Sequence, residues 1–415
     1  MILSPSPLVI QARGEVARMR EAAGKLLQGT CGWASPHQAL SIYGGKVRGS
    51  EERLRIYSRK AFAALEIDTT TYAIPNPERT RLWAELTPPG FTFLVKAFGV
   101  FCGSVDVGNL PKSTRAVLGV DPADRKRVSY SDLCEVARED LWRRFHAALE
   151  PLSESDKLGC VVFQFHLSSF GPHRTNRTHV EHLRAKLSPR IKMAVEFRDR
   201  AWIQGDEACR TVEWCRANDF ALVGADELLH ETMQPDRAQT GLRPGEVRRA
   251  MPTLLAATCE WGAVVRVHRR HGTRERLLED DEIRAWGRRI REVAPRMRGP
   301  IWCLWGTDWK DAAIENAAKL AAAVGDEIAF DWIGMQKKAS MQEKGGIASL
   351  FAKAQKSELS AEDRAAVSLA KTHKRPAEVH PARTVETSAI ARMFAAKKSK
   401  REDDDDERPE NEPRR

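Results

Sequence analysis

The chain has 415 residues, 42% of them hydrophobic, which is enough for one large domain or for two to three average ones. Its formal net charge of +10 permits nucleic-acid binding without requiring it. The eight cysteines form no Cys-x-x-Cys pair, which argues against a zinc finger or an iron–sulfur cluster and favours a reducing compartment. No apolar run reaches the roughly 18 residues of a membrane span, so we expect an intracellular protein with no membrane partner.

Residues 1–25 are expected to form an N-terminal arm, because this segment lacks a signal-peptide core. From residue 26 onward, apolar runs of strand length recur at regular intervals. Eight of them are predicted strands: 26–30, 64–67, 91–97, 160–165, 192–197, 220–225, 263–268 and 300–305. Eight segments are predicted helices: 51–62, 77–87, 137–151, 177–187, 206–218, 245–258, 279–292 and 310–324.

This alternation of continuous apolar strands with amphipathic helices indicates a parallel sheet covered on its outside. Eight units in roughly 300 residues predict an α/β fold of the (β/α)8 TIM-like barrel type over residues 26–335. An open doubly wound sheet is the alternative, but neither GxGxxG nor GxxxxGK[ST] follows any strand. The long polar region 99–136 is expected to be an insertion at the barrel rim.

Polar residues gather at the C-terminal ends of the predicted strands, which form the mouth of such a barrel. Residues two apart in a strand share a face. Four such pairs are Glu66 and Asp68, Gln164 and His166, Glu196 and Arg198, and Arg266 and His268. Lys96 ends the third strand, and Asp226 and Asp308 follow the sixth and the eighth. A structural ion-pair network would explain the charges, but we favour a ligand-binding or catalytic pocket.

These strand-end motifs resemble the YecE-like family (domain of unknown function 72). The similar segments are "GTCGWASP" (29–36), "ALEIDTTTY" (64–72), "FTFLVKA" (91–97), "VVFQF" (161–165), "AVEFRDRAW" (194–202), "VVRVH" (264–268) and "WGTDWKDAAIENA" (305–317). The resemblance implies a TIM-barrel fold and recurrent positions at Gly32, Trp33, Glu66, Tyr72, Lys96, Gln164, Glu196, Arg198, Trp202, Arg266, His268 and Asn316. It implies no established activity.

The chain departs from the pattern of that family in three places. Asp68 stands where the family usually has Asn, "FHLSSF" (165–170) replaces a Leu-Pro-Pro-Ser-Phe turn, and Gly306 with Thr307 replaces an Asn-Asn pair. The last change removes two amides from the mouth. The resemblance therefore does not imply that this chain binds the same ligand as bacterial relatives.

The first functional hypothesis is an enzyme, a hydrolase or lyase acting on a phosphate- or nucleotide-containing substrate. Glu66 and Glu196 would act as a general base or as metal ligands. Lys96, Arg198 and Arg266 would hold the anionic group, and His268 would transfer a proton. Ligand contacts are expected from Trp33, Asp68, Tyr72, Gln164, Asp226 and Asp308. No cofactor is indicated, and whether a metal binds stays open, although three cations disfavour a preformed metal cage. The alternative is a non-catalytic recruiting protein that binds a nucleotide or a nucleic acid.

Residues 336–415 are expected to be a disordered tail, because their only aromatic residues are Phe351 and Phe394. Two repeated peptides, 345–356 and 388–400, resemble peptides that bind sliding clamps. Their contact residues would be Ile347, Leu350, Phe351, Ile390, Met393 and Phe394. Amphipathic helical segments without a partner are the alternative. The basic cluster 397–401 resembles a nuclear-import signal and predicts a nuclear protein, and without nuclear import the protein would be cytoplasmic. Nuclear import and clamp binding together would place the protein in DNA replication or repair.

Overall fold

The structure is a computed structural model that describes residues 22–34, 40–44, 49–119, 126–165, 170–227, 251–268, 277–306 and 311–342. The chain divides into two units, residues 1–340 and 341–415. Several predicted features therefore lie outside the described residues: the arm up to residue 21, His166, Asp308, both clamp-like repeats and the basic cluster 397–401.

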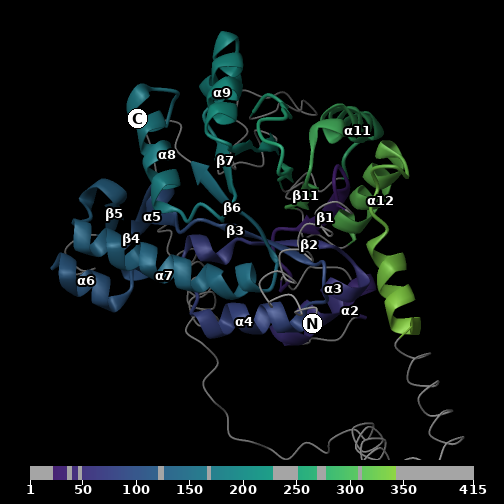
Figure 1. The fold of residues 1–415 in the computed structure, drawn as a ribbon, viewed down its shortest axis with the longest axis horizontal. Helices are drawn as coiled ribbons and strands as arrows, with labels where there is room; N and C mark the ends of the chain where they lie inside the picture. The colour runs from purple at the N-terminus through teal and green to yellow at the C-terminus, as the bar shows by residue number, and fades with distance from the viewer. Residues whose placement is uncertain are drawn as a thin grey trace, which may run out of the picture. The chain divides into compact units, whose positions relative to one another are not determined.

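Nine strands of the described chain form one sheet in which every neighbouring pair is parallel. Their order is β8 (Ala221–Leu222), β7 (Met193–Phe197), β6 (Leu158–Phe165), β3 (Thr92–Lys96), β2 (Ala64–Ile67), β1 (Leu26–Thr30), β11 (Ile301–Trp305), β10 (Ala263–Val267) and β9 (Gly224–Asp226). β8 pairs with β7 and β9 pairs with β10, yet both belong to one stretch, 221–226. This split sixth strand joins the two ends of the sheet, which confirms the predicted barrel (Figure 1).

Seven of the eight predicted helices are present: α3 (Ser50–Lys60), α4 (Pro77–Leu86), α7 (Glu135–Glu154), α8 (Arg174–Lys186), α9 (Asp206–Ala217), α11 (Asp280–Val293) and α12 (Ala312–Val324). The prediction of a helix over 245–258 is wrong for residues 251–258, which are described and not helical. Pro252 disfavours a helix that continues through it, because it lacks an N–H donor and disfavours helical geometry at the residue before it. Residues 253–258 have no such explanation, since a helix can begin at a proline. Residues 245–250 lie outside the described chain.

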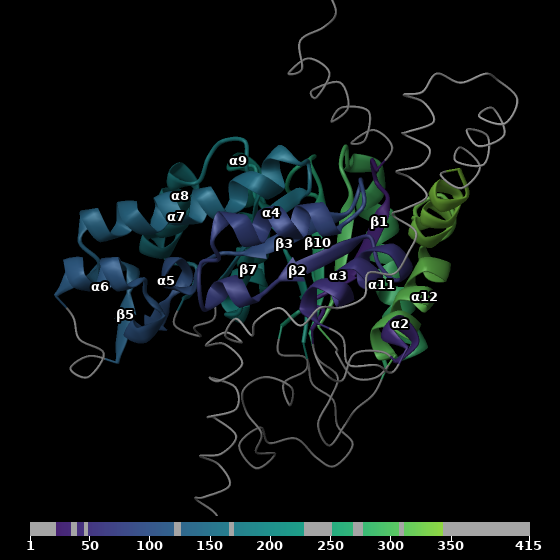
Figure 2. The ribbon, with the colours of Figure 1, turned by 90° about the horizontal axis from the view of Figure 1, so that it is seen from below.

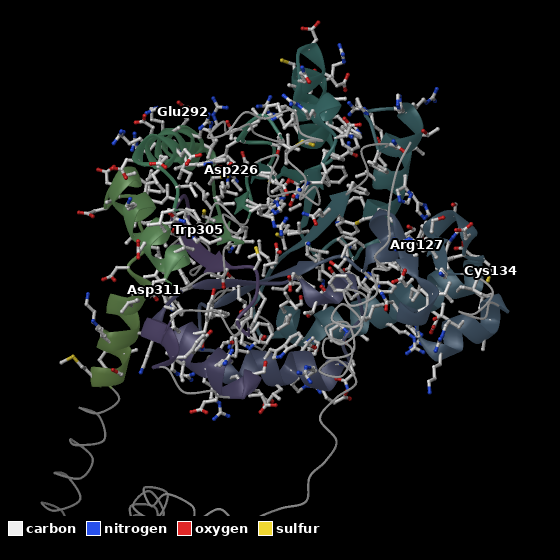
Figure 3. All side chains as sticks on the ribbon, turned by 180° about the vertical axis from the view of Figure 1, so that it is seen from behind. Arg127, Cys134, Asp226, Glu292, Trp305 and Asp311 are labelled. Carbon is white, nitrogen blue, oxygen red and sulfur yellow. The ribbon has the colours of Figure 1, made fainter. Side chains whose placement is uncertain are left out.

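The rim insertion is ordered by its contacts with the helix layer. It contains α5 (Gly99–Cys102), β4 (Ser104–Asp106), α6 (Lys112–Leu118) and β5 (Arg127–Ser129), and β4 pairs antiparallel with β5. Phe101 stacks on Trp142 of α7 with ring centroids 4.1 Å apart, and its carbonyl oxygen lies 2.9 Å from Nε2 of His179 in α8. Figure 2 shows the insertion beside α7. In Figure 3, Arg127 and Cys134 lie at the edge of the molecule, away from Asp226 and Trp305 of the barrel.

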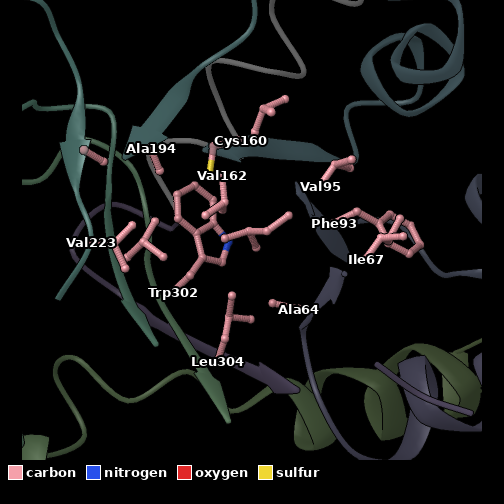
Figure 4. Packing of buried hydrophobic residues seen from close by; sticks show 14 of the residues in the cluster. Ala64, Ile67, Phe93, Val95, Cys160, Val162, Ala194, Val223, Trp302 and Leu304 are labelled. Carbon is pink, nitrogen blue, oxygen red and sulfur yellow. The ribbon is translucent and has the colours of Figure 1, made fainter. Parts of the chain in front are cut away.

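The indole of Trp302 closes the N-terminal end of the barrel. Figure 4 shows Ala194, Cys160, Val162, Val223, Leu304 and Ala64 around it. Its Nε1 donates to Oγ1 of Thr92 at 3.0 Å. A Cβ at Gly262 would come within 2.7 Å of the ring, and one at Gly159 within 3.0 Å. Glycine at these two strand starts therefore gives the indole its space.

The chain after α12 returns to the start of the barrel. Ala329 forms a parallel bridge with Leu26, and the indole of Trp332 donates to the carbonyl oxygen of Ser58 at 2.8 Å. A helix then extends from Trp332 through residue 342, so residues 336–342 of the predicted tail are helical. Within the described residues, no helix is both long and apolar enough to cross a membrane.

Candidate functional site

The barrel interior changes from apolar to charged toward the mouth. Because strand residues two apart share a face, Glu66 lies on the face of Ala64, and Glu196 on that of Ala194. Ala64 and Ala194 border the apolar interior around Trp302 (Figure 4). Both glutamates are fully buried. Each strand therefore carries its carboxylate just above the apolar core.

Arg266 of β10 joins these two carboxylates. Its Nε and Nη2 donate to the two oxygens of Glu66 at 2.7 and 2.6 Å, and its Nη1 donates to Oε2 of Glu196. Burial acts to lower the pKa of Arg266, but Glu196 and Glu66 outweigh it and raise that pKa well above its usual value. Removing one partner from such a buried network costs about 3–5 kcal/mol, because a buried charge is left uncompensated.

Glu196 is the most connected carboxylate of the mouth. Its Oε1 accepts from Nε2 of Gln164 at 2.7 Å and from Nη1 of Arg198 at 3.1 Å, and it lies 3.2 Å from Nε2 of His268. Burial acts to raise the pKa of this carboxyl, but Arg266, His268 and Arg198 hold it well below its usual range. Glu196 is therefore ionised at neutral pH.

The pKa of His268 in the mouth lies far from its ordinary value. Burial, reinforced by two arginines and opposed by Glu196, lowers its pKa to about 3. The ring is therefore neutral near pH 7. Nη1 of Arg198 can only donate, and it lies 3.0 Å from Nε2 of His268. Oε1 of Glu196, which can only accept, lies 3.2 Å from the same nitrogen, so the two contacts call for opposite tautomers of the ring.

Lys96 extends the network to β3. Its Nζ donates to Oε1 of Gln164 at 2.8 Å, and Gln164 in turn donates to Glu196. The hydroxyl of Thr70 donates to the carbonyl oxygen of Lys96 at 2.6 Å and to that of Ile67 at 2.9 Å, which fixes the end of β3 against the end of β2. The ammonium thus contacts a neutral amide and is only partly buried.

The structure joins seven predicted site residues into one hydrogen-bonded network, the mouth network: Glu66, Lys96, Gln164, Glu196, Arg198, Arg266 and His268. Asp226 lies beside it, because its carbonyl oxygen accepts from the backbone N–H of His268 at 2.8 Å. Its carboxylate instead accepts from Nε1 of Trp286 in α11 at 2.7 Å. That contact turns the side chain toward the helix layer.

Among the described residues, two predicted ligand contacts, Trp33 and Tyr72, do not join the mouth network. The indole of Trp33 donates to the carbonyl oxygen of Ser50 at 2.8 Å and packs edge-on against Trp83. Tyr72 is 64% exposed, and Asp68, which precedes the short helix Thr69–Thr71, is partly buried.

Two residues of the mouth were missed from the sequence. Glu227 is buried and forms an ion pair with Nη2 of Arg198. Cys31 follows β1, and its sulfur lies 3.9 Å from Nη2 of Arg266. The alternation of side chains along a strand could have indicated both. Glu227 is two residues from Ala225, and Cys31 is two residues from Gly29, so each shares the face of that strand residue.

Among the residues that the structure describes, no three His, Cys, Asp or Glu side chains are placed to hold a metal ion. The two buried glutamates are instead occupied by arginines. Burial and the charge of Glu66 also raise the pKa of the Cys31 thiol, which makes it a poor metal ligand or nucleophile near neutral pH.

Comparison with known proteins is consistent with this architecture. The chain matches the family described as "Protein of unknown function DUF72" over residues 27–340. It is 28% identical over 243 residues to UPF0759 protein YunF of Bacillus subtilis (strain 168), covering 59% of this chain and 70% of that protein. Two crystal structures of a DUF72 family protein from Enterococcus faecalis V583 share the fold, with TM-scores of 0.53 and 0.51 and identities of 19% and 18%. These alignments cover 74% and 72% of this chain, and 97% of the bacterial chain in both cases. Because the family match extends over most of its length, this chain belongs to the DUF72 family.

Proposed function

We propose that the barrel mouth binds a small molecule carrying an anionic group, a phosphate or a carboxylate, and that Lys96 is the cation that contacts it. The observation that carries this proposal is a difference among the cations of the mouth. Arg198 and Arg266 are each paired with two carboxylates. Lys96 donates to the neutral amide of Gln164.

An ammonium group has three donors. Within the described part of the chain, one donor of Lys96 has an acceptor, Oε1 of Gln164. An anionic oxygen would accept from the others and would neutralise the charge. The attraction is stronger here than in open water, because the group is partly buried and the effective dielectric is lower. We expect a bulky anion and not a metal ion beside Lys96. The neighbouring carboxylates, which could otherwise coordinate a metal, are already paired with arginines.

Calorimetric titration of the full chain with inorganic phosphate tests the proposal. Lys96→Met keeps the apolar stem and removes the charge, so we expect phosphate to bind at least about 10-fold more weakly, the scale of one charged hydrogen bond. Lys319→Met is the matched control, because Lys319 lies on the outer face of α12 and pairs with Asp280 there. Equal phosphate affinity of the two variants would reject the proposal.

We extend the proposal to catalysis, with a phosphate- or nucleotide-containing substrate and a hydrolase or lyase reaction. His268 supports this extension, because a neutral imidazole beside an anion site can hydrogen-bond to a reacting oxygen. Phosphate release from para-nitrophenyl phosphate and its diester provides the assay. An enzyme should lose turnover in His268→Gln while phosphate still binds. Phosphate binding by wild-type protein with no turnover of either probe would instead favour the non-catalytic alternative, a recruiting protein.

Recruitment through the tail is a separate proposal. It is supported by the repeat of Ile-Ala-x-[Leu/Met]-Phe-Ala at 347–352 and 390–395, which lies outside the described residues. Two weak peptides on one chain gain affinity for a multivalent partner by avidity. A sliding clamp, with its repeated binding sites, is the proposed partner, and nuclear import through residues 397–401 belongs to the same proposal.

A further inference from the structure

A hollow lined by three arginines lies at the end of the barrel opposite the mouth. It encloses about 620 Å³, and its charged lining residues are Arg216, Glu260, Arg296 and Arg298. Arg216 lies at the end of α9, just before β8, Glu260 lies before β10, and the other two lie before β11. All four therefore sit at the N-terminal ends of strands. We call this feature the arginine hollow.

The positive charge of the arginine hollow is poorly compensated. Glu260 pairs with Arg298 at 2.9 Å, but the two side chains are 64% and 79% exposed, so the pair contributes little to stability. Arg216 donates through Nε to the carbonyl oxygen of Ala257 at 3.1 Å. The described residues give the guanidinium of Arg296 no polar partner. Three guanidinium groups thus face one carboxylate.

The exposure and spacing of the arginines indicate which kind of anion the arginine hollow would bind. Its arginines are exposed on the rim, and the buried polar side chain in its lining, Thr258, already accepts from the backbone N–H of Leu222 at 3.0 Å. The strand starts that carry them span two inter-strand steps, roughly 10 Å. Along the axis of a duplex, that length corresponds to about three base-pair steps and thus to about three phosphates of one strand. A row of phosphates crossing the hollow would meet several guanidinium groups at once, and arginine suits such contacts.

We propose that the arginine hollow binds the backbone of duplex nucleic acid without reading its sequence. The remaining lining residues, Ala257, Thr258, Cys259, Pro295 and Met297, include no aromatic ring on which an unpaired base could stack. Single-stranded binding sites rely on such rings. Contacts to phosphates alone fix position and carry no direct sequence information. This site is independent of the mouth network.

Fluorescence anisotropy of the full chain with a labelled duplex oligonucleotide tests the inference. For Arg296→Glu/Arg298→Glu we expect at least 10-fold weaker binding, with the slope of log K against log salt reduced by roughly 2, close to one unit per lost phosphate contact. Arg79→Glu/Arg81→Glu is the matched control, because it makes the same charge change at two exposed positions of α4, which follows the mouth end of β2 and does not line the hollow. Glu260→Gln should tighten binding, and Lys96→Met should leave it unchanged.

Several outcomes would overturn the inference. Equal losses in the two double variants would show that only net charge matters. Tighter binding of a single-stranded oligonucleotide, or binding of tripolyphosphate with none of duplex, would show a different ligand. Circular dichroism checks that the variants fold. Arg296→Ala, which breaks no hydrogen bond in the described structure, provides the test with least risk to the fold, and it should weaken duplex binding in the same direction.

Discussion

Arg266 is buried between two carboxylates, and its partners on β2 and β7 come from distant parts of the chain. Substitution of Glu66, Glu196 or Arg266 would leave buried charge unpaired, so loss of activity in those variants would report folding as much as chemistry. Lys96 and His268 are partly exposed members of the same network and are the informative positions for mutation.

His268 should make the stability of the protein depend on pH. Its pKa is about 3 in the folded protein and near 6.5 when unfolded, so the unfolded state binds more protons below pH 6.5. Stability from this group is therefore lost as pH falls through that window, by about 2 kcal/mol between pH 7 and pH 5. Urea unfolding at the two pH values measures it. His268→Gln should remove this part of the pH dependence, and an unchanged dependence would contradict the assignment.

The membership of the site was largely predictable from residue type and spacing, because strand alternation decides which side chains share the interior. The exceptions have local causes. Asp226 was predicted because it follows the sixth strand, but the alternation beginning at Ala225 points to Glu227, which pairs with Arg198. For Trp33, the acceptor of the indole N–H is the carbonyl of Ser50, a contact between loops that no sequence pattern specifies.

At the scale of the elements, strands and helices followed from periodicity because each has one buried face. Residues 251–258 are the exception, since the apolar spacing indicated a helix that would have to run through Pro252, which has no N–H to donate. The closure of the barrel also depends on how the strands pair, which periodicity does not indicate. The sixth strand pairs with one neighbour through β8 and with the other through β9.

The aromatic closure of the barrel floor can be tested by mutation. Trp302→Ala should destabilise the protein by about 3–5 kcal/mol, because it leaves a cavity between strands that cannot collapse freely. Trp302→Phe should cost less, since it fills part of the space and loses the bond to Thr92. Urea unfolding gives both values. A loss below about 1 kcal/mol for the alanine variant would show that the indole does not support the floor.

At the scale of the whole molecule, the barrel carries two proposed anion sites at opposite ends, and the chain continues into a segment with proposed partner peptides. A peptide covering residues 342–356 should bind a sliding clamp with roughly micromolar affinity, because its apolar side chains gain burial only on a partner. Phe351→Ala should abolish that binding in calorimetry, and residues 342–415 should bind more tightly than the peptide. Absence of binding at high micromolar concentration would reject this partner.

The most direct measurement of the central claim is a crystal structure of the full chain soaked with tungstate, a heavy-atom mimic of phosphate. Anomalous scattering would locate the anion without assuming its place. The account predicts a peak at the barrel mouth within hydrogen-bond distance of Nζ of Lys96, and its loss in Lys96→Met. Tungstate bound elsewhere, with an empty mouth in wild-type protein, would contradict the account.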